Sequence, residues 1–189
     1  MQINNHLLIW LDLEMTGLNP NKDHIIEIAI VITDNNLEII NKGIVIPIYQ
    51  SDNILNYMDS WNKNIHKKTG LIKKIKNSKF NEKKAEIYIL NLLKSYIKPN
   101  TVPLCGNSIY KDRMFLYNYM PNLEKYFHYR NIDISSIKEL IKRWKPKIYS
   151  KLKQKKYQHS AYYDICESIN ELKFYKNFIF NNKIISKID

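Results

Sequence analysis

The sequence is poor in cysteine and glycine, with 2 and 4 of these residues among 189, and its apolar runs are short. Cys105 and Cys166 form no CxxC pair, which excludes a disulfide framework and a four-thiolate zinc site. The longest apolar stretches, such as Leu7–Leu11 and Ile28–Ile32, are too short to span a bilayer. Met1–Asn5 has neither a basic n-region nor an apolar h-region. We therefore expect no signal peptide, no membrane association and a cytoplasmic protein.

Acidic residues are also scarce. Asp and Glu number 18 against 30 Lys and Arg, which gives a formal net charge of +12. An excess of this size is typical of proteins that bind a polyanion such as nucleic acid or an anionic membrane surface. However, Lys, Asn, Ile and Tyr all have A/T-rich codons, and a genome drifting toward A and T produces a similar composition. The charge by itself therefore assigns no function.

The length is that of one domain, and 44% of the residues are hydrophobic, which is ample for a core. No internal repeat, low-complexity linker or shift in composition divides the sequence. We therefore expect a single domain over residues 1–189, with a core from about residue 8 to about residue 178 and a C-terminal tail over about 180–189.

Hydrophobic periodicity predicts an α/β fold. Three apolar, β-branched runs separated by turn signals predict an antiparallel meander of strands, over His6–Glu14, His24–Thr33 and Leu37–Ile48. The period then changes, and further elements alternate between helix and strand. The expected helices are Asn81–Ile97, Tyr110–Tyr119, Ser135–Trp144 and Ala161–Phe178, and the expected strands are Val102–Cys105 and Phe127–Ile134. This order is typical of a mixed sheet flanked by helices.

Asp12 and Glu14 lie two residues apart in the first predicted strand. Because side chains of a strand alternate between its faces, both carboxylates project from the same face, roughly 6.6–6.8 Å apart along the chain. Two such acids repel each other unless a cation lies between them, and hard divalent ions prefer oxygen ligands. The alternative is a solvent-facing strand that carries incidental acids.

Three further residues follow in a fixed order. Asp112 opens a predicted helix, and Asp164 lies in the first turns of the last one, where an acid also has the purely structural role of complementing the helix N-terminus. His159 precedes Asp164 by five residues, and the two converge if His159 lies on the loop that leads into the helix. Each residue alone is typical of a structural role, and the set is what indicates chemistry.

The order Asp, Glu, Asp, His, Asp resembles that of the DEDDh exonucleases, a branch of the RNase H-like superfamily. Flanking motifs are similar to those of the oligoribonuclease family in particular, and they cover the chain from about Leu8 to about Phe178. In chain order, these motifs are Trp10–Leu18, Cys105–Ile109, Asp112-Arg113, Tyr126–Arg130, Asp133, Ser135, Lys138–Leu140 and Arg143–Pro146. The resemblance implies an RNase H-like mixed sheet, an antiparallel meander plus parallel strands. It also implies a 3′-to-5′ exoribonuclease that degrades very short RNA, especially dinucleotides, to nucleoside 5′-monophosphates.

The resemblance further implies a set of catalytic residues. Two divalent ions, Mg²⁺ or Mn²⁺, would be held by the four acids, one orienting the attacking water and the other stabilising the leaving group. His159 matches the general base, a role that suits imidazole because its ordinary pKa is about 6.5. The metal ligands carried over are Asp12, Glu14, Asp112 and Asp164.

Substrate-binding residues are carried over in the same way. A phosphate-capping group would bind the 5′ phosphate of a short RNA, and a second group would stack on, wedge or hold the bases. The first group is Ser108, Arg130, Ser135 and Ser136, and the second is Leu18, Trp61, His66 and Tyr129. The family is a homodimer, so Tyr129 would reach into the partner's site. As alternatives, Trp61 and Tyr129 are core or interface residues and Arg130 is a member of a surface ion pair.

Departures from the family pattern concern the pocket and leave the acids intact. Tyr110 replaces a small Gly, Lys67-Lys68-Thr69 replaces a less charged stretch, and Tyr163 stands where an acid is common. Two other classes of function stay open. One is a different DEDDh enzyme, such as a proofreading-type DNA exonuclease or a tRNA-trimming RNase. The other is a non-catalytic nucleic-acid-binding protein on the same fold.

Overall fold

The computed structural model of the protein describes residues 6–152 and 160–180, so the predicted tail over about 180–189 lies almost entirely outside the described residues. Five strands form one sheet with the order β3-β2-β1-β4-β5. Antiparallel pairing joins β1 to β2 and β2 to β3, whereas β1, β4 and β5 run parallel. The strands are β1 (Leu8–Met15), β2 (Ile25–Thr33), β3 (Ile44–Pro47), β4 (Leu104–Gly106) and β5 (Asn131–Asp133). The predicted mixed sheet, a meander plus parallel strands, is confirmed.

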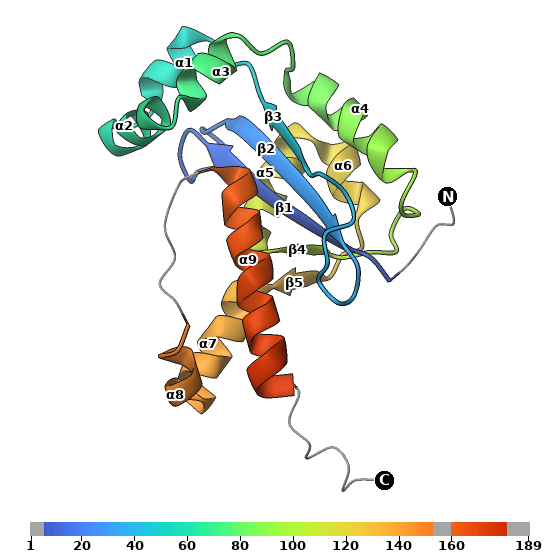
Figure 1. The fold of residues 1–189 in the computed structure, drawn as a ribbon. Coiled ribbons are helices and arrows are strands. Elements are labelled where there is room, and N and C mark those ends of the chain that lie inside the picture. Colours follow the sequence, from blue (N-terminus) through green and yellow to red (C-terminus); the bar gives the residue numbers. More distant parts are fainter. Residues whose placement is uncertain (1–5, 153–159, 181–189) are drawn as a thin grey trace, which may run out of the picture.

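Helices cover both faces of this sheet, and α9 crosses one of them (Figure 1). The helices are α1 (Asp52–Tyr57), α2 (Ser60–Lys68), α3 (Leu71–Lys76), α4 (Glu82–Leu93), α5 (Ile109–Tyr119), α6 (Pro121–Tyr126), α7 (Ile134–Trp144), α8 (Pro146–Tyr149) and α9 (Ala161–Tyr175), which continues into the π-helical turn η1 (Lys176–Phe180). None of the helices within residues 6–152 and 160–180 has the length and apolarity needed to cross a membrane.

The alternation of β1 distributes its side chains between two hydrophobic clusters. Ile9, Leu11 and Leu13 belong to a core that includes residues of α4, α5 and α6. Trp10 points to the opposite face and packs in a second core with residues of α7 and α9. Since burial on both faces removes a large apolar area from water, β1 is held firmly at the centre of the sheet. Asp12 and Glu14 share the alternation of Trp10 and therefore face α9.

Two predicted strands are shorter than expected. The third one begins only at Ile44 because Leu37 and Gly43 adopt positive φ angles of 70° and 73°. In that segment the side chain of Asn41 accepts the hydrogen bond of the Ile32 N–H at 2.9 Å, which replaces a strand partner. The strand expected over Phe127–Ile134 is reduced to β5, because the carbonyls before it bind a side chain of α5 instead of a neighbouring strand.

Five helices of the described residues, α1, α2, α3, α6 and α8, have no counterpart in the sequence prediction. Buried residues of α1 and α3 pack with Met58 into a separate small cluster, which includes Ile26 of β2, and α2 contacts α3. The side chain of Asn62 in α2 donates to the Thr16 carbonyl at 3.4 Å, which places α2 beside the C-terminal end of β1 (Figure 1). The helix predicted over Asn81–Ile97 also ends earlier than expected, at Leu93.

Candidate functional site

Three carboxylates meet between the centre of the sheet and α9. Asp12 and Glu14 come from β1 and Asp164 from the first turn of α9, and one carboxylate oxygen of each lies within 4.8 Å of the others. The same-face placement expected from the strand period is therefore confirmed. The sequence pattern did not give the distance to Asp164, which is 150 residues away along the chain and is brought to β1 by the packing of α9.

The start of α9 is fixed by contacts on both sides of Asp164. Ala161 and Ile165 are buried in the second core, so the helix presents Asp164 beside its buried stripe. The Ala161 N–H donates a hydrogen bond to the carboxylate of Glu27. Glu27 is 3% exposed and lies opposite Glu14 in the β1–β2 register. Glu27 thus anchors the helix that carries Asp164, a role that sequence reasoning missed. The sequence did carry a signal for this role, because Glu27 is the one acidic residue in the otherwise apolar run of β2.

Electrostatics make this acidic group unfavourable without a cation. Burial raises the pKa of Glu14 to about 8, and the negative charges of Asp164, Glu27 and Asp112 add to the effect. Carboxylates that lie close together in a partly buried site either retain protons or bind a cation that neutralises their negative charge. Because the three side chains of the group offer only carboxylate oxygens, the arrangement fits a hard divalent ion such as Mg²⁺ or Mn²⁺.

Asp112, the fourth predicted ligand, is not a member of the group of three. It lies on α5 and is buried, and its Oδ1 accepts a hydrogen bond from the Leu13 N–H at 3.0 Å. Burial raises the pKa of Asp112 to about 8, and the charge of Asp133 contributes, although the Leu13 hydrogen bond opposes the shift. Asp112 is close enough to raise the pKa of Glu14. Its role as a ligand stays a prediction.

The segment between β4 and α5 explains how Asp112 reaches β1. β1 pairs with β4 at Ile9 and Trp10, so the Leu13 N–H lies beyond the last β4 partner and is open to a side chain. Gly106 permits this close approach, because a Cβ at this position would lie 2.8 Å from the Leu11 carbonyl oxygen. Ser108 then begins α5 from a left-handed conformation with a φ of 51°.

The predicted phosphate-capping residues are partly brought together. The Ser108 hydroxyl donates to the Ser135 hydroxyl at 3.1 Å, and the Ser135 hydroxyl donates to Asn107 Oδ1 at 3.2 Å. Asp133 Oδ1 accepts from the backbone N–H of both serines, at 3.0 and 2.9 Å. Ser136 is the next residue of α7 and is exposed. Two serine hydroxyls thus lie side by side at the start of α5 and α7.

Asn107 connects these hydroxyls to the acidic group. Its Nδ2 donates to the Ser168 hydroxyl at 2.5 Å, and Ser168 in turn donates to the carbonyl of Asp164 at 2.8 Å. The network therefore joins α5, α7 and α9. Asn107 and Ser168 were not predicted as site residues. The turn motif Gly106-Asn107-Ser108 pointed to the first, whereas Ser168 carries no signal in the sequence.

The remaining predicted binding residues are mostly exposed. Leu18 is 73%, Trp61 62% and Tyr129 73% exposed, which excludes the alternative that Trp61 and Tyr129 are core residues of this chain. The guanidinium carbon of Arg130 lies 5.4 Å from the centre of the Tyr129 ring. His66 differs from these residues, since it lies on α2 with 2% exposure. Contacts of these residues with a substrate stay predictions.

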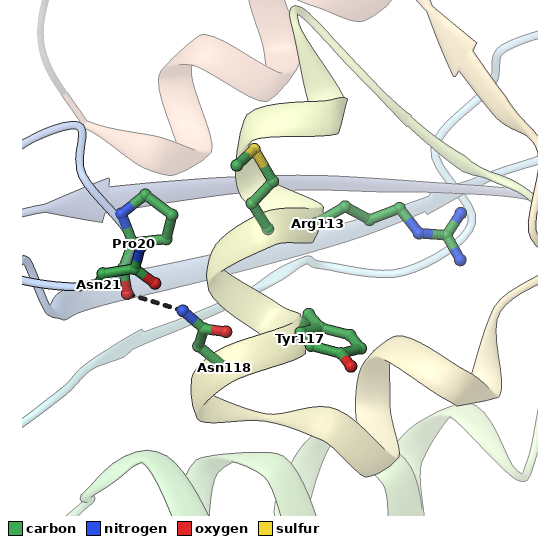
Figure 2. Close-up of a pocket in the computed structure, with 6 residues that line it drawn as sticks. Pro20, Asn21, Arg113, Tyr117 and Asn118 are labelled. Carbon is green, nitrogen blue, oxygen red and sulfur yellow. Dashed lines mark hydrogen bonds between the residues drawn. The ribbon is translucent and has the colours of Figure 1, made fainter.

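His159, the predicted general base, lies outside the described residues. Of the residues that depart from the family pattern, Tyr110 lies on α5 and its side chain is 52% exposed to solvent. Lys67 and Lys68 are exposed at the end of α2, and Tyr163 is half-buried. The pocket in Figure 2, about 320 Å³ in volume, lies beside α5, and none of the four predicted acidic ligands lines it. Its lining residues are Pro20, Asn21, Arg113, Met114, Tyr117 and Asn118.

The exonuclease family model RNase_T matches residues 9–172, which include the mixed sheet and the carboxylates of β1 and α9. Solved structures agree on the fold. Exonuclease I from Methylocaldum szegediense superposes with a TM-score of 0.69 at 15% identity, over 93% of this chain and 41% of that one. E. coli Exonuclease I in complex with a dT13 oligonucleotide gives a TM-score of 0.69 at 16% identity, over 90% and 41% of the two chains. This chain spans less than half the length of those proteins. The likeness in fold confirms the predicted RNase H-like fold.

Curated relatives are more similar in sequence. Oligoribonuclease from Buchnera aphidicola subsp. Acyrthosiphon pisum is 56% identical over 95% of this chain and 97% of its own length. Oligoribonucleases from Acinetobacter baylyi and Bordetella pertussis are 51% and 48% identical, over 92% and 95% of this chain and 94% and 98% of their own lengths. The chain belongs to the oligoribonuclease family.

Proposed function

We propose that the protein is a 3′-to-5′ exoribonuclease that hydrolyses very short oligoribonucleotides, especially dinucleotides, to nucleoside 5′-monophosphates. The observation that carries the proposal is the convergence of Asp12, Glu14 and Asp164 in a chain about half identical to oligoribonucleases over nearly its whole length. The chain as a whole is positively charged, whereas these three side chains are acidic. A local cluster of negative charge is expected where a cation, and not a phosphate, must be bound.

The four acids would hold two divalent ions, Mg²⁺ or Mn²⁺. Asp12, Glu14 and Asp164 supply the group within 4.8 Å, and Asp112 supplies a fourth carboxylate from α5. When bound, such ions supply Lewis acidity and neutralise the charge that develops on the phosphodiester during hydrolysis. The protein's own contribution is rigidity. β1 is buried on both faces, and α9 and α5 are hydrogen bonded at the residues that carry or contact the acids.

Proton transfer would fall to His159. This residue precedes the first residue of α9 by two positions and Asp164 by five in the sequence. In the proposed reaction its neutral imidazole takes a proton from the attacking water as the water oxygen bonds to phosphorus and the bond from phosphorus to the 3′ oxygen breaks. The 3′ oxygen leaves with the bonding electrons and takes up a proton from solvent. A group with an ordinary pKa of about 6.5 suits this transfer near neutral pH.

The preference for very short RNA is assigned to a phosphate cap and a set of base contacts. Arg130 with Ser108, Ser135 and Ser136 would bind the 5′ phosphate, since a guanidinium is a planar donor fork and hydroxyls add further donors. The juxtaposed hydroxyls of Ser108 and Ser135 support this assignment. Leu18, Trp61 and Tyr129 offer exposed apolar surface for bases, and His66 would hold one of them. The net charge of +12 would add electrostatic steering.

The proposal includes a cytoplasmic homodimer in which Tyr129 reaches into the partner's site. An exposed apolar stripe on α5 supports an interface there, because Tyr110, Met114 and Tyr117 recur with helical spacing and are 52%, 45% and 67% exposed. Tyr129 itself is 73% exposed. A side chain of this size in water is typical of a residue that another molecule covers.

One experiment tests the function against its alternatives. Purified protein is incubated with 5′-labelled RNA of two to about twenty nucleotides and with single-stranded DNA, in Mg²⁺ or in EDTA, and mononucleotide release is followed. We expect metal-dependent cleavage that is fastest on the dinucleotide. Equal or faster cleavage of long RNA or of DNA would assign a different DEDDh exonuclease activity. Binding of RNA without metal-dependent cleavage would assign a non-catalytic role.

A further inference from the structure

Arg113 binds a turn of the chain that carries two of the predicted substrate contacts. Its Nη1 donates to the carbonyls of His128 and Tyr129, at 2.8 and 3.2 Å, and to Asn131 Oδ1 at 2.8 Å. Its Nε donates to Glu124 Oε1 of α6 at 3.0 Å, and the Arg113 side chain is only 12% exposed. One guanidinium therefore holds the residues on both sides of Arg130.

The turn, residues 128–131, has few other supports. The His128 N–H donates to the Val102 carbonyl at 2.9 Å, and Asn131 begins β5, which pairs with Leu104. Within the turn, the Arg130 N–H donates to His128 Nδ1 at 3.1 Å. The side chains of Tyr129 and Arg130 are exposed. Their direction is set mainly by the backbone, and two of the carbonyls of that backbone are bound by Arg113.

The same helix also supports the loop that carries Leu18. Asn118 Nδ2 donates to the Pro20 carbonyl at 2.8 Å, and the Tyr119 hydroxyl donates to the Asp23 carbonyl at 2.7 Å. Figure 2 shows Arg113 extending from α5 away from Pro20 and Asn21, so the helix reaches the two loops in different directions. Asp112, the residue before Arg113, binds β1. α5 thus has a fixed distance to the acids and to both loops.

We propose that Arg113 is a positioning residue for substrate binding, which holds the turn of Tyr129 and Arg130 in one conformation and so fixes the direction in which both side chains project. The inference rests on the proposed function. In this proposal Arg113 acts through the turn and not on the reacting atoms, because its Nε donates to Glu124 and its Nη1 donates to the turn. Lysine cannot replace it, since an ammonium group lacks the planar fork that reaches several acceptors at once.

The anchor itself is tested without any assay of activity. Hydrogen exchange of the peptide that contains residues 127–131 is compared in the wild-type protein, Arg113→Met and Arg113→Lys. Arg143→Met is the matched control, because Arg143 is 63% exposed and pairs within α7 with Glu139. We expect faster exchange in both Arg113 variants and no change in the control. Unchanged exchange in Arg113→Met would overturn the inference whatever the protein's function is.

The consequence for binding is tested with two substrates. For a dinucleotide, Arg113→Met should raise KM roughly tenfold or more, a change expected when charge-assisted contacts lose their geometry. For bis(p-nitrophenyl) phosphate, which has no base or 5′ phosphate, kcat/KM should change less than about twofold. An equal loss on both substrates would place Arg113 in the metal site and overturn the inference. If the wild-type protein does not cleave dinucleotides, the proposed function fails and the exchange result still stands.

A double-mutant cycle separates positioning from a general structural effect. If Arg113 acts through Tyr129, the KM effect of Arg113→Met should shrink in the Tyr129→Ala background. Strictly additive effects would contradict the inference. Should Arg113→Met fail to fold, Asn131→Ala removes one contact of the same guanidinium and leaves the Glu124 pair intact. Asn131→Ala must then raise both the exchange rate and the dinucleotide KM, and no change in either would overturn the inference.

Discussion

Asp112 accepts the backbone hydrogen bond of Leu13 at 3.0 Å, so one carboxylate serves both as a predicted ligand and as a substitute for a missing strand partner of β1. The two roles can be separated by substitution. Asp112→Asn keeps an oxygen that accepts from Leu13 but removes the charge. We expect this variant to lose at least about a hundredfold in activity while its melting temperature stays within a few degrees of wild type.

Asp112→Ala is the comparison for that experiment. It removes the acceptor as well, and leaving a buried N–H unpaired costs about 1–3 kcal/mol. Circular dichroism should therefore show a lower melting temperature for Asp112→Ala than for Asp112→Asn, with both inactive. Equal stability of the two variants would show that the Leu13 hydrogen bond contributes little, and full activity of Asp112→Asn would remove Asp112 from the set of ligands.

Asp12→Ala should abolish turnover and leave the metal-free protein folded. The substitution removes a metal-binding carboxylate, and it also relieves the repulsion among the three acids within 4.8 Å. We expect a melting temperature in EDTA equal to or above that of wild type. Stabilisation by added Mn²⁺ should disappear in the variant, because only the native state of the wild-type protein binds the ion. A large loss of stability in EDTA would contradict the assignment.

Stability of the metal-free protein should fall as the pH rises toward about 8. Burial raises the pKa of Glu14 from 4.5 to about 8 in the folded state. Between these values the folded protein binds more protons at Glu14 than the unfolded chain does. The associated stability is fully present below about pH 4.5 and is lost as the pH passes through about 8.

The control for this pH dependence is Glu14→Gln, which cannot titrate at that position. Chemical denaturation in EDTA at pH 5 to 9 gives the free energy of unfolding of both proteins. The free energy of unfolding of the wild type should fall relative to that of Glu14→Gln as the pH rises, and a constant difference between the two would refute the prediction. Added Mg²⁺ should stabilise the wild type more at high pH, because metal binding requires deprotonated carboxylates.

Arg130→Ala should weaken dinucleotide binding without affecting the metal site. The guanidinium lies against the exposed ring of Tyr129 and is proposed to bind the 5′ phosphate. Loss of charge-assisted hydrogen bonds of this kind raises Kd roughly tenfold or more. Calorimetry with a 5′-phosphorylated dinucleotide measures the effect, and Mn²⁺ affinity is measured in parallel. Arg143→Ala is the surface control, and unchanged dinucleotide affinity in Arg130→Ala would remove Arg130 from the phosphate cap.

The helices missed by sequence analysis have a common physical cause. α1, α2 and α3 are short and interrupted by capping residues such as Asp59 and Gly70, so no window of sequence shows a sustained helical period. α1 and α3 are stabilised by packing against Ile26 and each other, and α2 contacts α3. α6 begins at Pro121, and the buried carboxylate of Glu86 on α4 accepts its first N–H groups, a contact between segments 36 residues apart.

The sequence by itself determined which residues are proposed to carry the chemistry and, for the four acids, on what kind of element each lies. The strand period placed Asp12 and Glu14 on one face, and local helix signals placed Asp112 and Asp164 at the starts of helices. Family motifs then indicated the reaction, because side-chain identity is a property of the chain alone. Only the tertiary structure decided that Asp164 joins the two strand acids and that Asp112 binds Leu13 beside them. It also decided that Arg113 holds the turn of Tyr129 and Arg130. These relationships join segments far apart in sequence, and their distances follow from how α5 and α9 pack on the sheet, which no local pattern encodes.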